Sequence, residues 1–172
     1  MNRKPFLVTF AGVPGSGKSA IAMRLSLVFD LPVLSNNVIR VEVHEDTLEA
    51  YLNQEKFEAL RDERADILFD KKSSFIYDTS VDRRMDDIKK LAEEKGYRVF
   101  VISMDLSDEF IAKLQNAKEY HPPEEYVKSW SEDHQKFLTD HQADTGLGIT
   151  DENFSNRQRL AEEAVRTFIT QL

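Results

Sequence analysis

The sequence predicts an α/β fold in which a parallel β-sheet is covered by helices on both faces. Short apolar segments alternate along the chain with longer helical segments, and this alternation requires right-handed crossovers between parallel strands. The first apolar segment, PFLVTFA at residues 5–11, is apolar on both faces, as expected of a central strand. With 172 residues, 41% of them hydrophobic, the chain is long enough for one domain with a substantial core.

Apolar spacing and helix breakers define the elements of the first half. We expect them at residues 5–11 (strand), 18–29 (helix), 32–35 (short strand) and 47–70 (charged amphipathic helix). Pro32 ends the first helix because proline disfavours a helical conformation in the residue before it. The stretch through His44 is helical or irregular. Leu48 and Tyr51 belong to the apolar stripe that we expect on the helix beginning at Thr47.

The second half continues the alternation. We expect elements at residues 74–78 (strand), 81–95 (helix), 97–104 (strand), 107–120 and 123–140 (helices), 146–153 (loop or edge strand) and 155–172 (helix). Ser80 or Asp82 is the expected cap of the first of these helices, and Gly96 ends it. Four strands are clear and a fifth is possible. The chain is therefore expected to form a sheet of four to five strands.

Composition excludes several classes of protein. The chain has 23 Lys and Arg against 31 Asp and Glu, a net charge of −8, which disfavours long nucleic acids and anionic membranes as partners. It has no cysteine, so disulfide scaffolds and thiolate chemistry are excluded. No apolar segment is long enough to span a membrane, and we expect a cytoplasmic protein. Composition says nothing of the oligomeric state.

The motif that indicates chemistry is GVPGSGKS at residues 12–19, which matches G-x-x-x-x-G-K-[ST] between a strand and a helix. Glycines let successive backbone N–H groups wrap a polyphosphate, and the helix N-terminus adds its dipole. Lys18 is expected to reach the β- and γ-phosphates, and the Ser19 hydroxyl to bind Mg²⁺. The predicted nucleotide-binding residues are Gly12, Val13, Pro14, Gly15, Ser16, Gly17, Lys18, Ser19 and Ala20.

A carboxylate for the magnesium ion is expected at the end of a neighbouring buried strand, where Asp78 lies. Its alternative role is to cap the following helix. His134 and His141 are seven residues apart on a helix, which favours a solvated surface rather than a metal site. Trp130 and Phe137 share that spacing, which favours core packing.

The sequence contains four motifs of interest: residues 12–19, Asn37-x-x-Arg40, Asp78-Thr79-Ser80 with Arg83 or Arg84, and Asn116-Ala117-Lys118 ahead of Pro122-Pro123. Together they resemble the small P-loop kinases related to polynucleotide kinase, zeta toxin and gluconate kinase. The resemblance implies the P-loop containing nucleoside triphosphate hydrolase fold, a three-layer sandwich with strand order 2-3-1-4-5. It also implies a substrate-binding helical segment near 36–72, a lid-like segment near 107–141, and transfer of the ATP γ-phosphate to a small-molecule or nucleotide-type acceptor.

The resemblance assigns roles to further residues. Lys18, Asp78, Arg40 and Lys118 are the implied catalytic residues, and Asn37, Arg40, Arg83 and Arg84 the implied substrate-binding residues. Lys113 is the other candidate for the lid cation. ATP is the implied nucleotide, with GTP less favoured. A hydrolytic NTPase switch ranks below the other functions, because no N-K-x-D guanine motif occurs.

Two departures from the family pattern support an alternative function. Asn37 stands where the family carries the aspartate that takes the acceptor proton, and an amide is not a base. Gln115 and Glu119 stand where the lid usually has arginines, and lysine lacks the planar fork of arginine. Glu42 or Asp46 would have to replace the base. The alternative is therefore a nucleotide-binding regulatory module without transferase activity.

Overall fold

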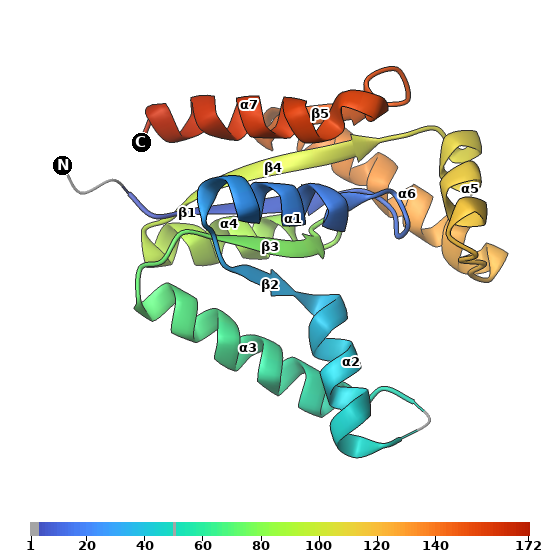
Figure 1. Ribbon diagram of the computed structural model, residues 1–172, viewed down its shortest axis with the longest axis horizontal. Helices are drawn as coiled ribbons and strands as arrows, with labels where there is room; N and C mark the ends of the chain where they lie inside the picture. Colours follow the sequence, from blue (N-terminus) through green and yellow to red (C-terminus); the bar gives the residue numbers. More distant parts are fainter. Residues whose placement is uncertain (1–3, 50) are drawn as a thin grey trace.

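The sheet at the centre of the molecule has five parallel strands in the order β2-β3-β1-β4-β5, as expected from the family resemblance. The computed structural model describes residues 4–49 and 51–172 (Figure 1). The strands are β1 (Phe6–Ala11), β2 (Val33–Ser35), β3 (Phe75–Ser80), β4 (Arg98–Asp105) and β5 (Thr145–Thr150). The segment expected as a loop or edge strand is therefore the edge strand β5.

Helices cover both faces of this sheet. They are α1 (Lys18–Phe29), α2 (Asn36–Thr47), α3 (Gln54–Asp70), α4 (Met85–Lys95), α5 (Asp108–Ala117), α6 (Glu124–Asp140) and α7 (Arg157–Thr170), with short 3₁₀ turns at Gln142–Asp144 and Phe154–Asn156. Within the described residues no helix is long and apolar enough to cross a membrane.

The alternation of side chains along β1 creates two hydrophobic cores. Phe6, Val8 and Phe10 pack in the cluster that includes buried residues of α1 and α7. Leu7 and Ala11 point to the other face, where the cluster includes buried residues of α2, α3, α4 and α6. Figure 1 shows α1 and α7 together on one side of the sheet, with α2 and α3 extending away from it as a lobe. All strands of this parallel sheet end at the same edge, which places the loops that follow them together.

The prediction of one helix over residues 47–70 is wrong. Helix α2 ends at Thr47, Leu48 adopts a left-handed conformation (φ 54°), and α3 begins at Gln54. The Asn53 side chain accepts a hydrogen bond from the Lys56 N–H and so caps α3. Leu48 and Tyr51, expected in the apolar stripe, are 87% and 85% exposed. Their spacing indicated one continuous helix, but the Asn53 cap begins a new helix after them.

The predicted cap of α4 is also wrong. Strand β3 continues to Ser80, α4 begins only at Met85, and Arg84 at its N-cap position makes no side-chain cap. The Asp82 carboxylate binds elsewhere, at the loop that follows β1. At the other end of α4 the prediction is confirmed, because Gly96 takes a left-handed conformation (φ 76°) and ends the helix.

Candidate nucleotide and acceptor site

The loop between β1 and α1 is built on glycines that no other residue can replace without strain. Gly12 and Gly17 have φ of 125° and 98°, in the region that side chains rarely adopt. A Cβ at Gly12 would lie 2.8 Å from Cβ of Met104 on the neighbouring strand. Gly17 is the N-cap residue of α1, so the unpaired N–H groups of that helix open directly onto the loop.

Lys18 folds back over this loop. Its Nζ donates hydrogen bonds to the carbonyl oxygens of Gly12 (2.6 Å) and Val13 (2.8 Å). Burial lowers the pKa of Lys18 to about 8, although the carboxylates of Asp82 and Asp78 act in the opposite direction. The ammonium group is thus held by neutral acceptors in a place that favours an incoming anion.

Ser19 and Asp78 meet at the mouth of the loop. The Ser19 hydroxyl donates to Asp78 Oδ1 at 3.1 Å, and the Ser35 hydroxyl of β2 donates to the other carboxylate oxygen at 3.2 Å. Asp78 is only 8% exposed. Residues 4–49 and 51–172 contain no group of three or more His, Cys, Asp and Glu side chains that could hold a metal ion. One hydroxyl and one carboxylate instead fit Mg²⁺, which takes oxygen ligands and completes its shell with phosphates and water.

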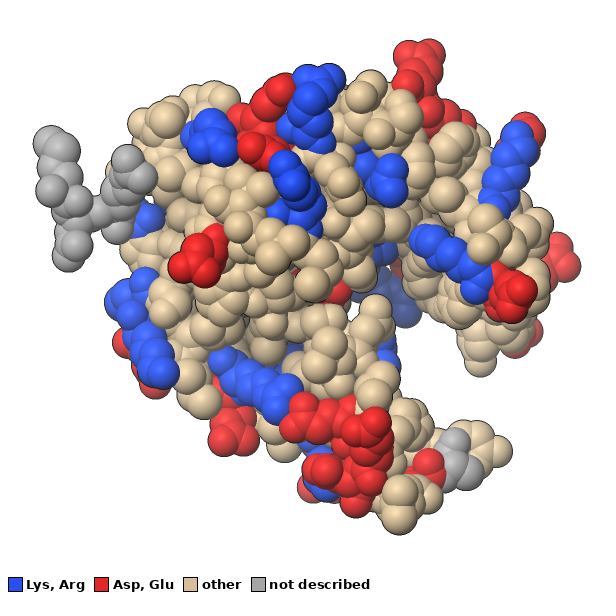
Figure 2. Space-filling model, in the orientation of Figure 1, with Lys and Arg blue, Asp and Glu red and all other residues tan. Residues whose placement is uncertain are grey.

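A cavity of about 800 Å³ joins this loop to the expected acceptor residues. In Figure 2 the surface is hollowed between the α2–α3 lobe and the body of the molecule, with basic side chains inside the hollow. The cavity is lined by Gly12, Pro14, Gly15, Gly17, Lys18, Ser19, Ala20, Asn36, Asn37, Arg40, Asp78, Thr79, Ser80, Asp82, Arg83, Arg84, Lys118, Tyr120, Trp130 and Asp133. Of the predicted site residues, only Val13 and Ser16 are not in this set, and both are buried in the loop.

At the α2 end of the cavity, Asn37 and Arg40 are partners. Arg40 Nη1 donates to Asn37 Oδ1 at 3.1 Å, and the guanidinium lies over the ring of Phe57, 5.2 Å from its centroid. The two carboxylates considered as a replacement base are engaged in ion pairs. Glu42 binds Arg64 at 2.6 Å, and Asp46 lies 3.3 Å from Lys56.

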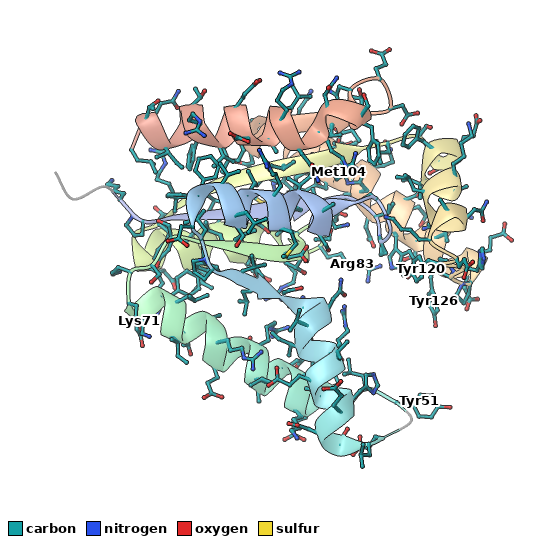
Figure 3. The ribbon with its side chains drawn as sticks, viewed as in Figure 1. Tyr51, Lys71, Arg83, Met104, Tyr120 and Tyr126 are labelled. Atoms are coloured by element: carbon teal, nitrogen blue, oxygen red, sulfur yellow. The ribbon has the colours of Figure 1, made fainter. Side chains whose placement is uncertain are left out.

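The two consecutive arginines after β3 differ in their surroundings. Arg83 pairs with Asp133 and also donates to the Ser129 hydroxyl of α6 at 3.0 Å. Within the described residues Arg84 forms no ion pair, and the same is true of Arg40. Figure 3 places Arg83 and Tyr120 near each other, beside the loop, and Tyr51 at the far tip of the α2–α3 lobe.

The segment that includes α5 docks onto the loop from the other side. Lys118 Nζ donates to the Gly15 carbonyl at 2.6 Å, and Gln115 Nε2 donates to the Pro14 carbonyl at 3.1 Å. Burial lowers the pKa of Lys118, and the charge of Arg157 acts in the same direction. Lys113, the other lysine considered for this place, is an exposed partner of Glu109 instead.

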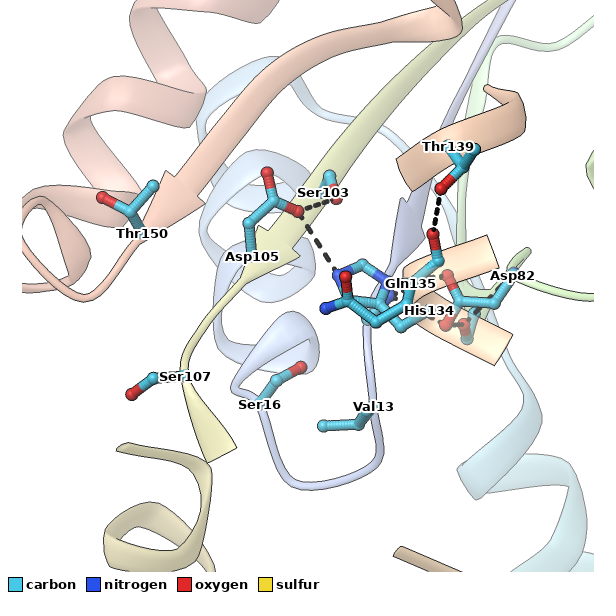
Figure 4. A network of polar contacts seen from close by, with 12 residues as sticks. Val13, Ser16, Asp82, Ser103, Asp105, Ser107, His134, Gln135, Thr139 and Thr150 are labelled. Atoms are coloured by element: carbon cyan, nitrogen blue, oxygen red, sulfur yellow. Dashed lines mark hydrogen bonds and ion pairs between the residues drawn. The ribbon is translucent and has the colours of Figure 1, made fainter. Parts of the chain in front are cut away.

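Sequence reasoning missed a buried charged network behind the loop. The Gly12 N–H donates to both carboxylate oxygens of Asp82 at 3.1 Å, and His134 Nδ1 lies 3.1 Å from Asp82 Oδ1 (Figure 4). On the other side of the ring, His134 Nε2 lies 3.3 Å from Asp105 Oδ1 at the end of β4. His134 is 3% exposed, so the expected surface histidine is wrong. No signal in the sequence connects His134 to Asp82, because the two residues come from distant elements.

The predictions for Trp130, Phe137 and His141, in α6 and directly after it, differ in their outcomes. Phe137 is buried in the core, as expected. Trp130 packs against the other core cluster and also lines the cavity, which core packing alone does not predict. His141 is a partly buried partner of Asp144.

Burial lowers the pKa of His134, but the carboxylates of Asp105 and Asp82 outweigh it and raise the pKa to about 9.

The fold and the site together define a class of protein. A glycine loop between the central strand and a helix, a lysine over that loop and a Ser–Asp pair at its mouth are the features of P-loop nucleotide-binding proteins. The family model described as AAA domain matches residues 7–138, and the chain belongs to that family. No curated protein matches the chain in sequence.

Solved structures with the same fold include small kinases. A gluconokinase from Sinorhizobium meliloti has a TM-score of 0.65 and 14% identity over 99% of this chain and 97% of its own. A tunicamycin resistance protein from Deinococcus radiodurans has a TM-score of 0.63 and 15% identity, with 95% of each chain covered. The APS kinase of Mycobacterium tuberculosis has a TM-score of 0.57 and 15% identity over 96% of this chain and 99% of its own. The resemblance to the P-loop kinase fold is therefore confirmed over almost the whole chain.

Proposed function

We propose that the protein is a Mg²⁺- and ATP-dependent kinase that transfers the γ-phosphoryl group to a small-molecule or nucleotide-type acceptor. One observation carries this proposal. The phosphate loop, the Ser19–Asp78 pair and the cationic residues Arg40 and Arg84 all line one cavity. A single cavity with room for a triphosphate at one end and cations at the other is the arrangement that phosphoryl transfer requires, because it depends mainly on positioning and charge neutralisation.

The triphosphate would lie against the backbone N–H groups of residues 15–19, at the N-terminus of α1. Lys18 now donates to the carbonyls of Gly12 and Val13. It would exchange these neutral acceptors for the β- and γ-phosphate oxygens, which make stronger charge-assisted hydrogen bonds. Lys118, held at the Gly15 carbonyl, would act from the opposite side as the cation of the lid.

Ser19 and Asp78 are the residues that would hold the magnesium ion. Bound there, the ion would neutralise charge on the β- and γ-phosphates during transfer. The Ser19 hydroxyl would turn from Asp78 Oδ1 to the ion, and the Ser35 hydroxyl would keep Asp78 Oδ2 in place. Ser35 would therefore hold Oδ2 of Asp78, and Oδ1 would be free to bind the ion.

Asn37 would orient the acceptor rather than take its proton. Its Oδ1 accepts from Arg40, so the amide group presents its N–H groups to a ligand in the cavity. Phosphoryl transfer passes through a loose transition state in most analyses, so the loss of a strong base is less damaging here than in acyl transfer. Arg40 and Arg84 would bind an anionic group of the acceptor.

The same residues also favour one alternative, a nucleotide-binding module without transferase activity. The Asn37 amide cannot accept a proton as an aspartate carboxylate does, and Lys118 lacks the fork with which arginine holds a transferring phosphoryl group. In this case ATP binds and its γ-phosphate is retained.

A transfer assay separates the two functions. The protein is incubated with Mg²⁺ and ATP labelled at the γ-phosphate, together with nucleosides, sugars, oligonucleotide ends and amino-sugar antibiotics. The kinase predicts label on one class of acceptor, abolished by Lys18→Ala and retained in Lys90→Ala, which alters an exposed lysine of α4. Tight ATP binding with no transfer to any acceptor would favour the alternative.

Asn37→Asp sharpens this assay. It places a carboxylate beside Arg40 at the position where the resembling kinases carry their base. The kinase predicts a faster transfer in this variant, because the acceptor proton then has a place to go. If the wild-type protein transfers no label and the variant does, the wild-type chain functions as the binding module.

A further inference from the structure

A buried histidine, His134, lies where α6 meets the carboxyl ends of β3 and β4. The imidazole of His134 points from α6 into the space between Asp82 and Asp105 (Figure 4). Its ring stacks on Phe137, with centroids 6.1 Å apart and planes at 7°. His134 does not line the cavity, and the proposed transfer makes no direct use of it.

The partners of the ring determine its protonation state. Nδ1 lies 3.1 Å from Asp82 Oδ1, and Nε2 lies 3.3 Å from Asp105 Oδ1. Ionised carboxylates only accept hydrogen bonds, so Nδ1 donates its hydrogen to Asp82. Nε2 has no hydrogen-bond partner, but the negative carboxylate of Asp105 at ion-pair distance on that side also favours the charged ring, the imidazolium. The charged groups that act on the ring are Asp82, which follows β3, and Asp105 on β4, while Lys18 of the phosphate loop acts on Asp82 from the far side.

Asp82 connects this ring to the phosphate loop. Both of its oxygens accept from the Gly12 N–H at 3.1 Å, and the Ser80 hydroxyl donates to Oδ2 at 2.8 Å. The Gly12 carbonyl in turn accepts from Lys18 Nζ at 2.6 Å. A continuous chain of polar contacts therefore runs from α6 to the lysine over the loop.

We propose that His134, as an imidazolium shared by Asp82 and Asp105, is a positioning residue that holds Asp82 against the Gly12 N–H and thereby keeps the phosphate loop in its nucleotide-binding shape. Without the positive charge, the carboxylates of Asp82, 9% exposed, and Asp105, 28% exposed, would face each other across a neutral ring and repel. Asp82 would then turn away from Gly12, and the loop and α6 would lose their common anchor. The functional consequence rests on the proposed function, whereas the link between His134 and Gly12 does not.

The first test uses the unaltered protein and NMR spectroscopy. Imidazole nitrogen shifts report the protonation of each of the four histidines, and the Gly12 amide reports the loop. We expect both nitrogens of His134 to be protonated at neutral pH. We also expect the Gly12 amide resonance to move with the titration of His134 near pH 9. A neutral His134 at neutral pH, or a Gly12 amide resonance that does not move during the titration of His134, overturns the proposal whether or not the protein is a kinase.

The second test measures binding of Mg-ATP by calorimetry. His134→Gln removes the positive charge and also the Nδ1 donor that faces Asp82, because the glutamine amide lies where Nε2 lies, and we expect the dissociation constant to rise about tenfold. Adding Asp105→Asn removes one of the two facing carboxylates and is expected to restore most of the affinity. His141→Gln, at the residue that follows α6, is the matched control and is expected to leave the affinity unchanged. Equal affinity in His134→Gln and the wild type, or no recovery in the double variant, contradicts a positioning role through charge.

Discussion

The two ends of the cavity are constructed differently. At the nucleotide end, the glycine loop, Lys18 and Ser19 come from one short segment, and carbonyl oxygens of the same loop hold Lys18. At the acceptor end, the lining comes from α2, the segment after β3, and α6. A short motif can encode the nucleotide end, because the backbone geometry of one loop forms it. The acceptor end depends instead on how distant elements pack.

The cations of the two ends differ as well. Lys18 and Lys118 donate to carbonyl oxygens of the loop, which are neutral and easily exchanged for phosphate. At the acceptor end Arg83 is neutralised by Asp133, whereas Arg40 and Arg84 form no ion pair within the described residues. The nucleotide end thus has the features of a large class of proteins, while under the proposed function the other end would set the specificity of this chain for its acceptor.

The largest effect is expected at the metal pair of the nucleotide end. Asp78→Asn removes the carboxylate that faces Ser19, and we expect phosphoryl transfer to fall by about 10²-fold or more, because charge on the transferring group is then less well neutralised. Asp87→Asn, on the exposed face of α4, is the control. The measurement is the initial rate at several Mg²⁺ concentrations. An unchanged rate in Asp78→Asn would place the metal elsewhere.

The glycine loop is expected to show a smaller but clear effect on stability. Gly12→Ala puts a Cβ within 2.8 Å of Met104 and strains a φ of 125°, so we expect the free energy of unfolding to fall by about 1–3 kcal/mol. Gly96→Ala is matched, because its φ is also positive but a Cβ there would meet no atom within 4 Å. Urea unfolding measures both variants. A Gly96 variant that loses more stability than the Gly12 variant would contradict the close approach at the loop.

The acceptor end predicts a difference between two adjacent arginines. Arg84→Ala is expected to raise the KM for the acceptor about tenfold, because a charge-assisted hydrogen bond is lost. Arg83→Ala is expected to change it less, since Arg83 is engaged with α6. Steady-state kinetics with the acceptor found by the transfer assay measures both. A larger effect in Arg83→Ala would reverse their assigned roles.

The smallest effect concerns protons. Burial lowers the pKa of Lys18 to about 8, and bound phosphate must raise it again, so binding above that pH takes up as much as one proton. Affinity for Mg-ATP is therefore expected to fall as the pH rises through 8 and beyond. Calorimetry in two buffers of different ionisation enthalpy detects the uptake. Lys18→Arg, which stays protonated, is expected to abolish it, and uptake that persists in this variant points to another group.

The limits of the sequence follow the same division. That the loop of residues 12–19 would lie beside Asp78 could be predicted because a motif and a short strand are local, and the family resemblance supplied the strand order. The end of α2 at Thr47 and the separate start of α3 at Gln54 could not be predicted, because Leu48 and Tyr51 continue a helical spacing and only the Asn53 cap shows where the second helix begins. The place of His134 could not be predicted either, because its ion-pair partners are Asp82, which follows β3, and Asp105 on β4, both far from it in the sequence. A local cap decided the first case, and packing between distant elements decided the second.

Titration of the protein with Mg-ATP in a calorimeter tests the central claim most directly, because that claim is a triphosphate site at the end of β1. We predict saturable binding of one nucleotide per chain, lost in Lys18→Ala and retained in Lys90→Ala. The absence of binding heat with the wild-type protein, or equal affinity in the Lys18 variant, would contradict the account.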